Sequence, residues 1–95
     1  MVHNLCSPRS GNPVANQFVI FTANGTYFQS YRTMIAKIGL DGKVTLSGDW
    51  CYSSTTSKYL YQFLSRYSGY GGLNKSKVSK LIENGTFEVV DNFTM

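Results

Sequence analysis

The sequence predicts an α+β domain in which two short helices accompany an antiparallel β-sheet, in the order ββββααβ. Two observations support this fold class. Hairpin-type dipeptides, Asn24-Gly25 and Asp41-Gly42, separate segments rich in β-branched and aromatic residues. After Ser53 the apolar residues change from strand-like to helix-like spacing. Because 95 residues provide surface for one modest core, we expect a single α+β domain over residues 17–95.

Residues 1–16 are interpreted as a flexible N-terminal arm. Pro8, Gly11 and Pro13 lie there among serines and asparagines, and the apolar residues show little periodicity. The arm has no apolar stretch of signal-peptide length, and no run in the chain approaches the roughly 18 apolar residues of a membrane helix. We therefore expect a cytoplasmic protein with no membrane partner.

The first hairpin is predicted from Gln17–Thr22 and Thr26–Thr33, two segments whose residues favour strands. Asn24-Gly25 between them suits a type I′ turn, in which both central residues need positive φ. Side chains alternate between the two faces of a strand. Alternation in the second strand places three residues on one face: Tyr27, Gln29 and Tyr31.

The segment Met34–Leu40 fits either a helical turn or a strand by its apolar spacing. The turn dipeptide Asp41-Gly42 and the following segment Lys43–Ser47 favour the strand, because together they form a second hairpin pattern.

Two helices and a last strand are predicted in the C-terminal half. Hydroxyl residues at Ser53–Ser57 suit a helix start. The first helix buries residues spaced i, i+3, i+4 and i+7: Leu60, Phe63, Leu64 and Tyr67. Glycines at 69, 71 and 72 end it. Asn74 then caps a second helix, Gly85 follows its end, and Phe87–Val90 forms a strand.

Positive charge concentrates in these two helices. The formal net charge is +4, yet residues 53–82 contain five basic residues and no acidic one. Cations interleaved with aromatic rings suit a nucleic acid, or a host protein with an acidic surface. A solvated lysine face that keeps the domain soluble is an equally good interpretation. The candidate nucleic-acid or partner-binding residues are Lys58, Tyr61, Arg66, Tyr70, Lys75, Lys77 and Lys80.

The tyrosines permit another interpretation, because tyrosine is favoured in protein–protein contacts. A sheet face that bears Tyr27, Gln29 and Tyr31 is a possible protein-contact surface. The alternative function is therefore a structural or assembly protein that forms a homodimer through this tyrosine-rich face.

Catalytic and metal-binding patterns are not recognisable in the sequence. The sole histidine, His3, lies in the predicted arm, so no nucleophile–base arrangement can be assembled. His3, Cys6 and Cys51 lack metal-ligand spacing. The two cysteines fit reduced thiols better than a single disulfide. The glycine-rich connector at residues 69–72 fits a flexible link better than a phosphate-binding turn. We expect a protein that is not an enzyme and has no cofactor.

Several runs of residues resemble a small uncharacterised domain that is common in tailed-phage genomes. The most distinctive pattern is FQSY at Phe28–Tyr31 followed by SxTTSKY at Ser53–Tyr59, and the similarity covers most of the chain after Asn16. Further matching runs are Asn16–Ile20, Gly25–Tyr27, Trp50–Tyr52, Phe63-Leu64 and Ile82–Gly85. This family has no established activity, so no functional residue is transferred. The resemblance implies a phage protein in the host cytoplasm that acts on nucleic acid, or inhibits host defence or transcription by stoichiometric binding.

Overall fold

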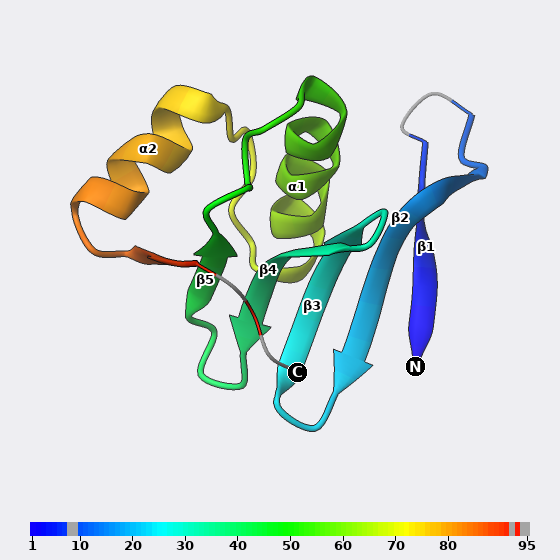
Figure 1. Cartoon of the computed structure of the whole chain (residues 1–95), viewed down its shortest axis with the longest axis horizontal. Coiled ribbons are helices and arrows are strands. Elements are labelled where there is room, and N and C mark those ends of the chain that lie inside the picture. Colours follow the sequence, from blue (N-terminus) through cyan, green and yellow to red (C-terminus); the bar gives the residue numbers. More distant parts are fainter. Residues whose placement is uncertain (8–9, 92, 94–95) are drawn as a thin grey trace.

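A computed structural model describes residues 1–7, 10–91 and 93 and shows an α+β fold of six strands and two helices (Figure 1). The order of elements is βββββααβ. Their bounds are β1 Val2–Cys6, β2 Pro13–Thr22, β3 Gly25–Ser30, β4 Thr33–Gly39, β5 Val44–Ser47, α1 Ser54–Tyr67, α2 Lys75–Glu83 and β6 Phe87–Val90. The predicted α+β class is confirmed, but the predicted order ββββααβ lacks the first strand.

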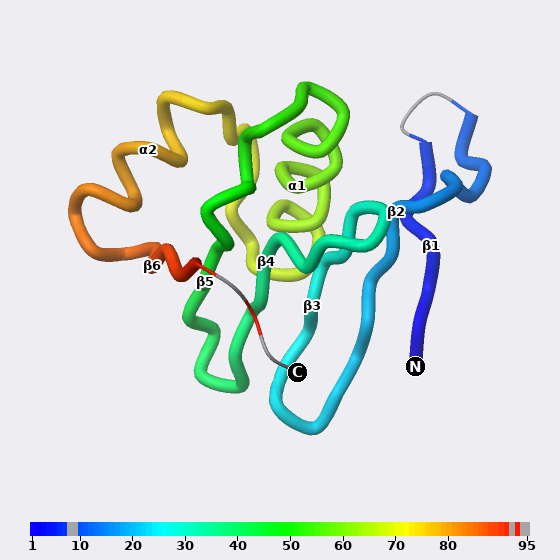
Figure 2. The backbone as a smooth tube through the Cα atoms, in the orientation of Figure 1, coloured from blue at the N-terminus to red at the C-terminus, as the bar shows by residue number. Residues whose placement is uncertain are grey.

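The six strands form one sheet in which their spatial order equals their order in the sequence. Strands β1 to β5 are joined by antiparallel pairing, whereas β6 pairs parallel to β5. Figure 2 shows β1 at one side of the sheet and β5 with β6 at the other. The helices occupy the connection between β5 and β6, and such a crossover allows the chain to return in the same direction. The sheet is therefore antiparallel except at one edge.

The segment that the sequence analysis assigned to a flexible arm contributes β1 and the first residues of β2 to this sheet. Strand β1 pairs with β2 through Val2↔Ile20, His3↔Val19 and Asn4↔Phe18. Strand β2 begins at Pro13, so the expected boundary at residue 16 falls inside a strand. The structure thus differs from the expected arm, because long-range pairing orders a segment that has little local signal of its own.

The first hairpin lies where predicted, but its glycine has a different role. Thr22 pairs with Gly25, so Ala23 and Asn24 form the loop, and neither has positive φ. The expected type I′ turn centred on Asn24-Gly25 is therefore wrong. Gly25 is instead the first residue of β3, with φ +145°, and a Cβ there would lie 2.4 Å from the Ile38 carbonyl oxygen. Close approach of β4 demands glycine at this position.

The hydrophobic core lies between the sheet and the two helices, which cover the same face of the sheet (Figure 1). Helix α1 packs on β3 and β4, and α2 packs beside β6. Phe28 of β3 stacks on Phe63 of α1 with ring centres 5.6 Å apart. The predicted buried residues Leu60, Phe63 and Leu64 of α1 are fully buried, as is Val78 of α2. These contacts place both helices, which carry the five basic residues of 53–82, in one layer on the sheet.

Candidate functional site

Helix α1 begins through hydroxyl contacts, as predicted. Ser53 is its N-cap, and the Ser53 Oγ accepts a hydrogen bond of 3.1 Å from the Thr56 backbone N–H. The Thr56 hydroxyl is buried and lies 3.0 Å from the hydroxyl of Ser30 in β3. This pair fixes the start of α1 on the sheet and so sets which side of the helix faces solvent.

The two cations of α1 lie on the same side of the helix. Lys58 and Arg66 are exposed and stand eight residues apart, with Gln62 between them. Each cation lies over the ring of the residue that follows it: the Lys58 Nζ is 5.3 Å from the ring centre of Tyr59, and the Arg66 Cζ is 5.9 Å from that of Tyr67. Residues four apart on a helix are neighbours, so these side chains form one row.

The three cations of α2 lie at the other end of the helical layer (Figure 1). Asn74 is the predicted N-cap, and its Oδ1 accepts from the Lys77 N–H at 2.9 Å. Lys75, Lys77 and Lys80 are exposed, and the Lys77 Nζ donates to the Gly72 carbonyl at 3.2 Å. The structure thus divides the candidate cations into an α1 row and an α2 group.

Acidic residues do not neutralise these helical cations. In the part of the chain that the structure describes, the one ion pair joins Lys43 and Glu88, with Nζ and Oε2 3.1 Å apart and both side chains half exposed. Lys43 belongs to the β4–β5 hairpin and Glu88 to β6. Among the described residues, no acidic side chain therefore forms an ion pair with a cation of α1 or α2.

The two tyrosines among the candidate site residues are half-buried. Burial raises the pKa of Tyr61, a hydrogen bond with Ser57 lowers it in part, and Cys51 raises it further. Tyr70 lies in the connector between the helices and packs edge-on against Phe87, with ring centres 5.0 Å apart. Both rings pack against the hydrophobic core.

The candidate protein-contact face is not one exposed patch. Tyr27 is 2% exposed, and its ring contacts Phe93. Strand β3 ends at Ser30, so Tyr31, which is 51% exposed, lies in the following turn with φ 56°. The Gln29 side chain donates to the Tyr31 carbonyl. The three residues are neighbours along the chain, but they present little tyrosine surface in common.

A hollow remains on the helical side of the sheet, above β1 and β2. A helix is about 10 Å wide and strands lie about 4.8 Å apart, so two helices cover about four strands. Helix α1 packs on β3 and β4 and α2 packs beside β6, so among the described residues the main helix contacts lie away from β1 and β2. The cavity there has a volume of about 290 Å³.

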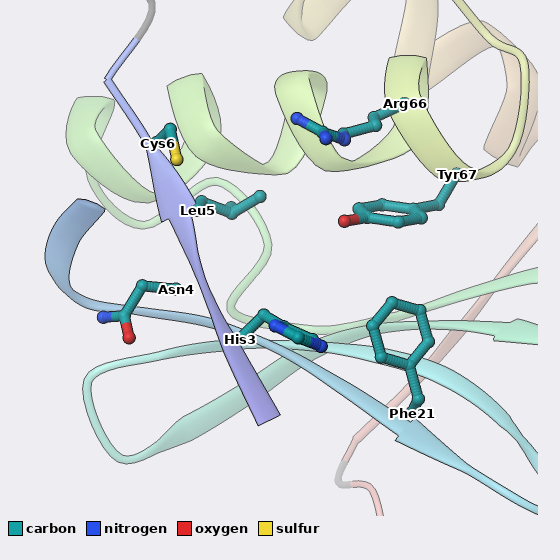
Figure 3. Close-up of a pocket in the computed structure, with 7 residues that line it drawn as sticks. All are labelled: His3, Asn4, Leu5, Cys6, Phe21, Arg66 and Tyr67. Carbon is teal, nitrogen blue, oxygen red and sulfur yellow. The ribbon is translucent and has the colours of Figure 1, made fainter. Parts of the chain in front are cut away.

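Residues from three elements surround this cavity (Figure 3). Alternation and register direct His3 and Leu5 of β1 toward the helical side, beside Phe21 of β2. The ring of Phe21 contacts those of His3 and Tyr67 edge-on, with centres 5.5 and 5.7 Å apart. The complete lining comprises His3, Asn4, Leu5, Cys6, Phe21, Arg66 and Tyr67.

Of the seven residues that line this pocket, Arg66 is the one that the sequence analysis named as a candidate binding residue. The segment Val2–Cys6 does not alternate between polar and apolar residues, so the sequence carried little local signal for the strand that forms one wall of the pocket. Cys6 and Cys51 are both free thiols. Within the described ranges, no group of three or more His, Cys, Asp or Glu residues could hold a metal ion. In the same ranges, no helix has the length and apolar character needed to cross a membrane.

Comparison with known proteins identifies a family but no function. Neither a curated protein nor a solved structure shows significant similarity to the chain. Residues 2–82 match a family of unknown function (DUF8033). The match begins in β1 and ends in α2, so it includes both the pocket and the cations of the helical layer. The chain therefore belongs to this family of unknown function.

Proposed function

We propose that the protein is a non-catalytic nucleic-acid-binding protein, and that the nucleic acid lies across the layer formed by α1 and α2. The observation that carries this proposal is the unpaired charge of that layer. Its five cations are exposed, and no acidic residue in the described part of the chain forms an ion pair with them. The cations are Lys58, Arg66, Lys75, Lys77 and Lys80.

The charge distribution along the chain supports the same surface. Residues 53–82 hold five basic and no acidic residues, whereas five acidic residues outnumber four basic ones in the remainder. Outside the helices, Lys43 is paired with Glu88 and the Lys37 Nζ lies 5.7 Å from the ring centre of Tyr27. A helical layer with a surplus of positive charge attracts polyanions and increases their rate of association.

The separation of the cations favours an extended ligand over a compact one. Lys58 and Arg66 belong to α1, while the other three cations belong to α2 at the far end of the layer. A small anion contacts one group only, but a nucleic-acid strand presents regularly spaced phosphates that reach both. Lysines that contact phosphates carry little sequence information, so the binding is expected to tolerate many sequences.

The resemblance to a domain common in tailed-phage genomes supplies the biological setting of this proposal. A small phage protein with such a surface acts in the host cytoplasm, where it occupies nucleic acid or the host machinery that handles it. Stoichiometric inhibition of host defence or transcription needs no catalytic group. The sole histidine, His3, lies beside Phe21 and Arg66 in the pocket, where the residues of the lining include no carboxylate.

Fluorescence anisotropy with labelled single-stranded and duplex oligonucleotides tests the proposal. If all five cations contact phosphates, the plot of log affinity against log salt is expected to have a slope of about −3.5 for single strands. Replacing Lys75, Lys77 and Lys80 together by Gln should make this slope shallower by about 2 units.

The matched control replaces Lys37 and Lys43 by Gln, which removes cations outside the helical layer. This control should leave the slope unchanged. A flat salt response, or an equal loss in the control, would refute the proposal. If oligonucleotides do not bind, a pull-down from infected-cell lysate treated with nuclease identifies an acidic protein as the partner instead.

A further inference from the structure

The pocket between β1 and the end of α1 combines one cation with aromatic walls (Figure 3). Arg66 extends above the cavity, and the rings of Phe21, Tyr67 and His3 lie along it. Leu5, which is 3% exposed, adds an apolar wall. Such a lining suits a ligand that has a flat, weakly polar part and a negative part.

We propose that this pocket binds one unpaired nucleotide, with its base against Phe21 and Tyr67 and its phosphate at Arg66. This inference rests on the proposed nucleic-acid binding and adds a specific contact to it. A guanidinium group holds phosphate oxygens through two parallel hydrogen bonds, which a lysine cannot reproduce. Aromatic side chains accept any base, because every base has a π-face.

The size of the pocket limits the ligand to a single unit. Its volume of about 290 Å³ lies just below the range for small-molecule sites, about 300–1,000 Å³. One nucleotide is a ligand of this scale, whereas a longer stretch of strand is not. A base inside a duplex is stacked and paired, so it reaches a pocket only after extrusion. The protein should therefore prefer single strands, strand ends or mismatches to an intact duplex.

The position of the pocket makes it continuous with the cation row of α1. Arg66 belongs to both, and Lys58 lies eight residues earlier on the same side of the helix. At 1.5 Å of rise per residue the two residues are separated by about 12 Å along the axis. A strand that leaves the pocket can therefore continue along α1 toward Lys58, which joins a nucleotide site to a phosphate track.

The side walls of the pocket are held by long-range hydrogen bonds. The Gln62 Nε2 of α1 donates to the Cys6 carbonyl of β1 at 2.7 Å. The Phe21 backbone N–H of β2 donates to the Met1 carbonyl at 2.8 Å. In β2, Asn16 adopts φ 66° where the register between β1 and β2 shifts. Bulges of this kind often re-aim side chains beside a site. The cavity is therefore a built feature of this sheet edge.

Titration with a nucleoside monophosphate, followed by amide NMR signals, tests the inference. Adenosine monophosphate should shift the signals of His3–Cys6, Phe21 and Tyr67, and should bind more tightly than adenosine or inorganic phosphate alone. Arg66→Gln leaves the core intact and should weaken binding about 10-fold, the effect of a lost charged hydrogen bond. Phe21→Leu retains an apolar wall and should weaken it about 5-fold or more. Lys37→Gln in β4, outside the helical layer, is the control and should leave the affinity for the monophosphate unchanged.

Oligonucleotide binding separates failure of this inference from failure of the proposed function. Phe21→Leu should lower affinity for a single strand while leaving duplex affinity unchanged. In one outcome, single-stranded and duplex oligonucleotides both bind with the expected salt dependence while the monophosphate leaves the NMR signals of the pocket residues unshifted. This result would overturn the assignment of the pocket and leave the proposed nucleic-acid binding by α1 and α2 in place. If the monophosphate binds at the pocket and no oligonucleotide binds, the link to a strand is overturned. Equal loss of monophosphate affinity in Lys37→Gln would likewise overturn the assignment to this pocket.

Discussion

Gln62 of α1 donates its Nε2 hydrogen to the main-chain carbonyl of Cys6 in β1, over 2.7 Å, although the two residues are 56 positions apart. The contact joins the helical layer to the edge strand that the sequence did not reveal. It also holds one wall of the pocket relative to Arg66, which lies one helical turn after Gln62. Its removal should therefore affect β1 more than the rest of the sheet.

Gln62→Ala should lower the free energy of unfolding by about 0.5–1.5 kcal/mol, the typical net value of one hydrogen bond. Hydrogen exchange should accelerate selectively at the amides of Val2–Cys6, because β1 loses its polar contact with α1. Urea unfolding and amide exchange measure the two effects. Gln29→Ala is the control, since the Gln29 side chain bonds locally to the Tyr31 carbonyl. Unchanged exchange in β1 would contradict the prediction.

Gly25→Ala should destabilise the fold by about 2–4 kcal/mol. A Cβ at this position lies 2.4 Å from the Ile38 carbonyl oxygen, and the φ of +145° is strained for any other residue. Gly48→Ala provides the comparison, because nothing lies within 4 Å of a Cβ there. Thermal unfolding of both variants measures the difference. Equal stability of the two variants would show that β3 and β4 do not approach as closely as described.

Ser30 and Thr56 should be coupled energetically through their buried hydroxyl contact of 3.0 Å. Thr56→Val leaves the Ser30 hydroxyl buried without this partner and should cost about 1–3 kcal/mol. Adding Ser30→Ala removes the second polar group, so the double variant should be more stable than the sum of the single effects implies. A double-mutant cycle by urea unfolding should give a coupling of at least about 0.5 kcal/mol. Strict additivity would argue against the contact.

Tyr61 should make the protein less stable at high pH. Burial raises the pKa of Tyr61 in the folded state above its ordinary value of 10.0. Between the unfolded and folded pKa values the folded state binds more protons, so stability falls as pH rises through this window and is unaffected below it. Tyr61→Phe should therefore lose less stability than the wild type between about pH 9 and 11.

The measurement is the free energy of unfolding in urea across that pH range. Tyr52→Phe serves as the control, because the Tyr52 side chain is largely exposed, and it should retain the pH dependence of the wild type. A Tyr61→Phe variant with the same pH dependence as the wild type would contradict a raised pKa for Tyr61.

Local signals predicted much of this fold. Ser53 and Asn74 cap their helices as expected, because a short polar side chain beside a free N–H acts within four residues. The ambiguous segment Met34–Leu40 forms β4 as far as Gly39, and Asp41 accepts from the Lys43 N–H in the following turn. These features depend on neighbours in the sequence, which is why the sequence was sufficient for them.

Strand β1, the parallel edge and the pocket depended on contacts that no local pattern contains. Val2–Cys6 has one strongly buried side chain, Leu5, so it shows no clear apolar alternation and becomes a strand by pairing with β2. The dipeptide pattern assigned Gly25 to a turn. In the structure, a glycine is required at this position because the Ile38 carbonyl of the neighbouring strand leaves no room for a Cβ. Register and close approach depend on the neighbouring strand, so they cannot be predicted from the local sequence of a single strand.

By itself the sequence determined the α+β class, the helix limits and the concentration of five cations in residues 53–82, since spacing, caps and composition are local properties. Only the tertiary structure decided that His3, Phe21 and Tyr67 meet beside Arg66, and that the cations divide between two ends of one layer. The physical reason is geometric: two helices are too narrow to cover six strands, and the strip that they leave open brings together residues that lie far apart in the sequence.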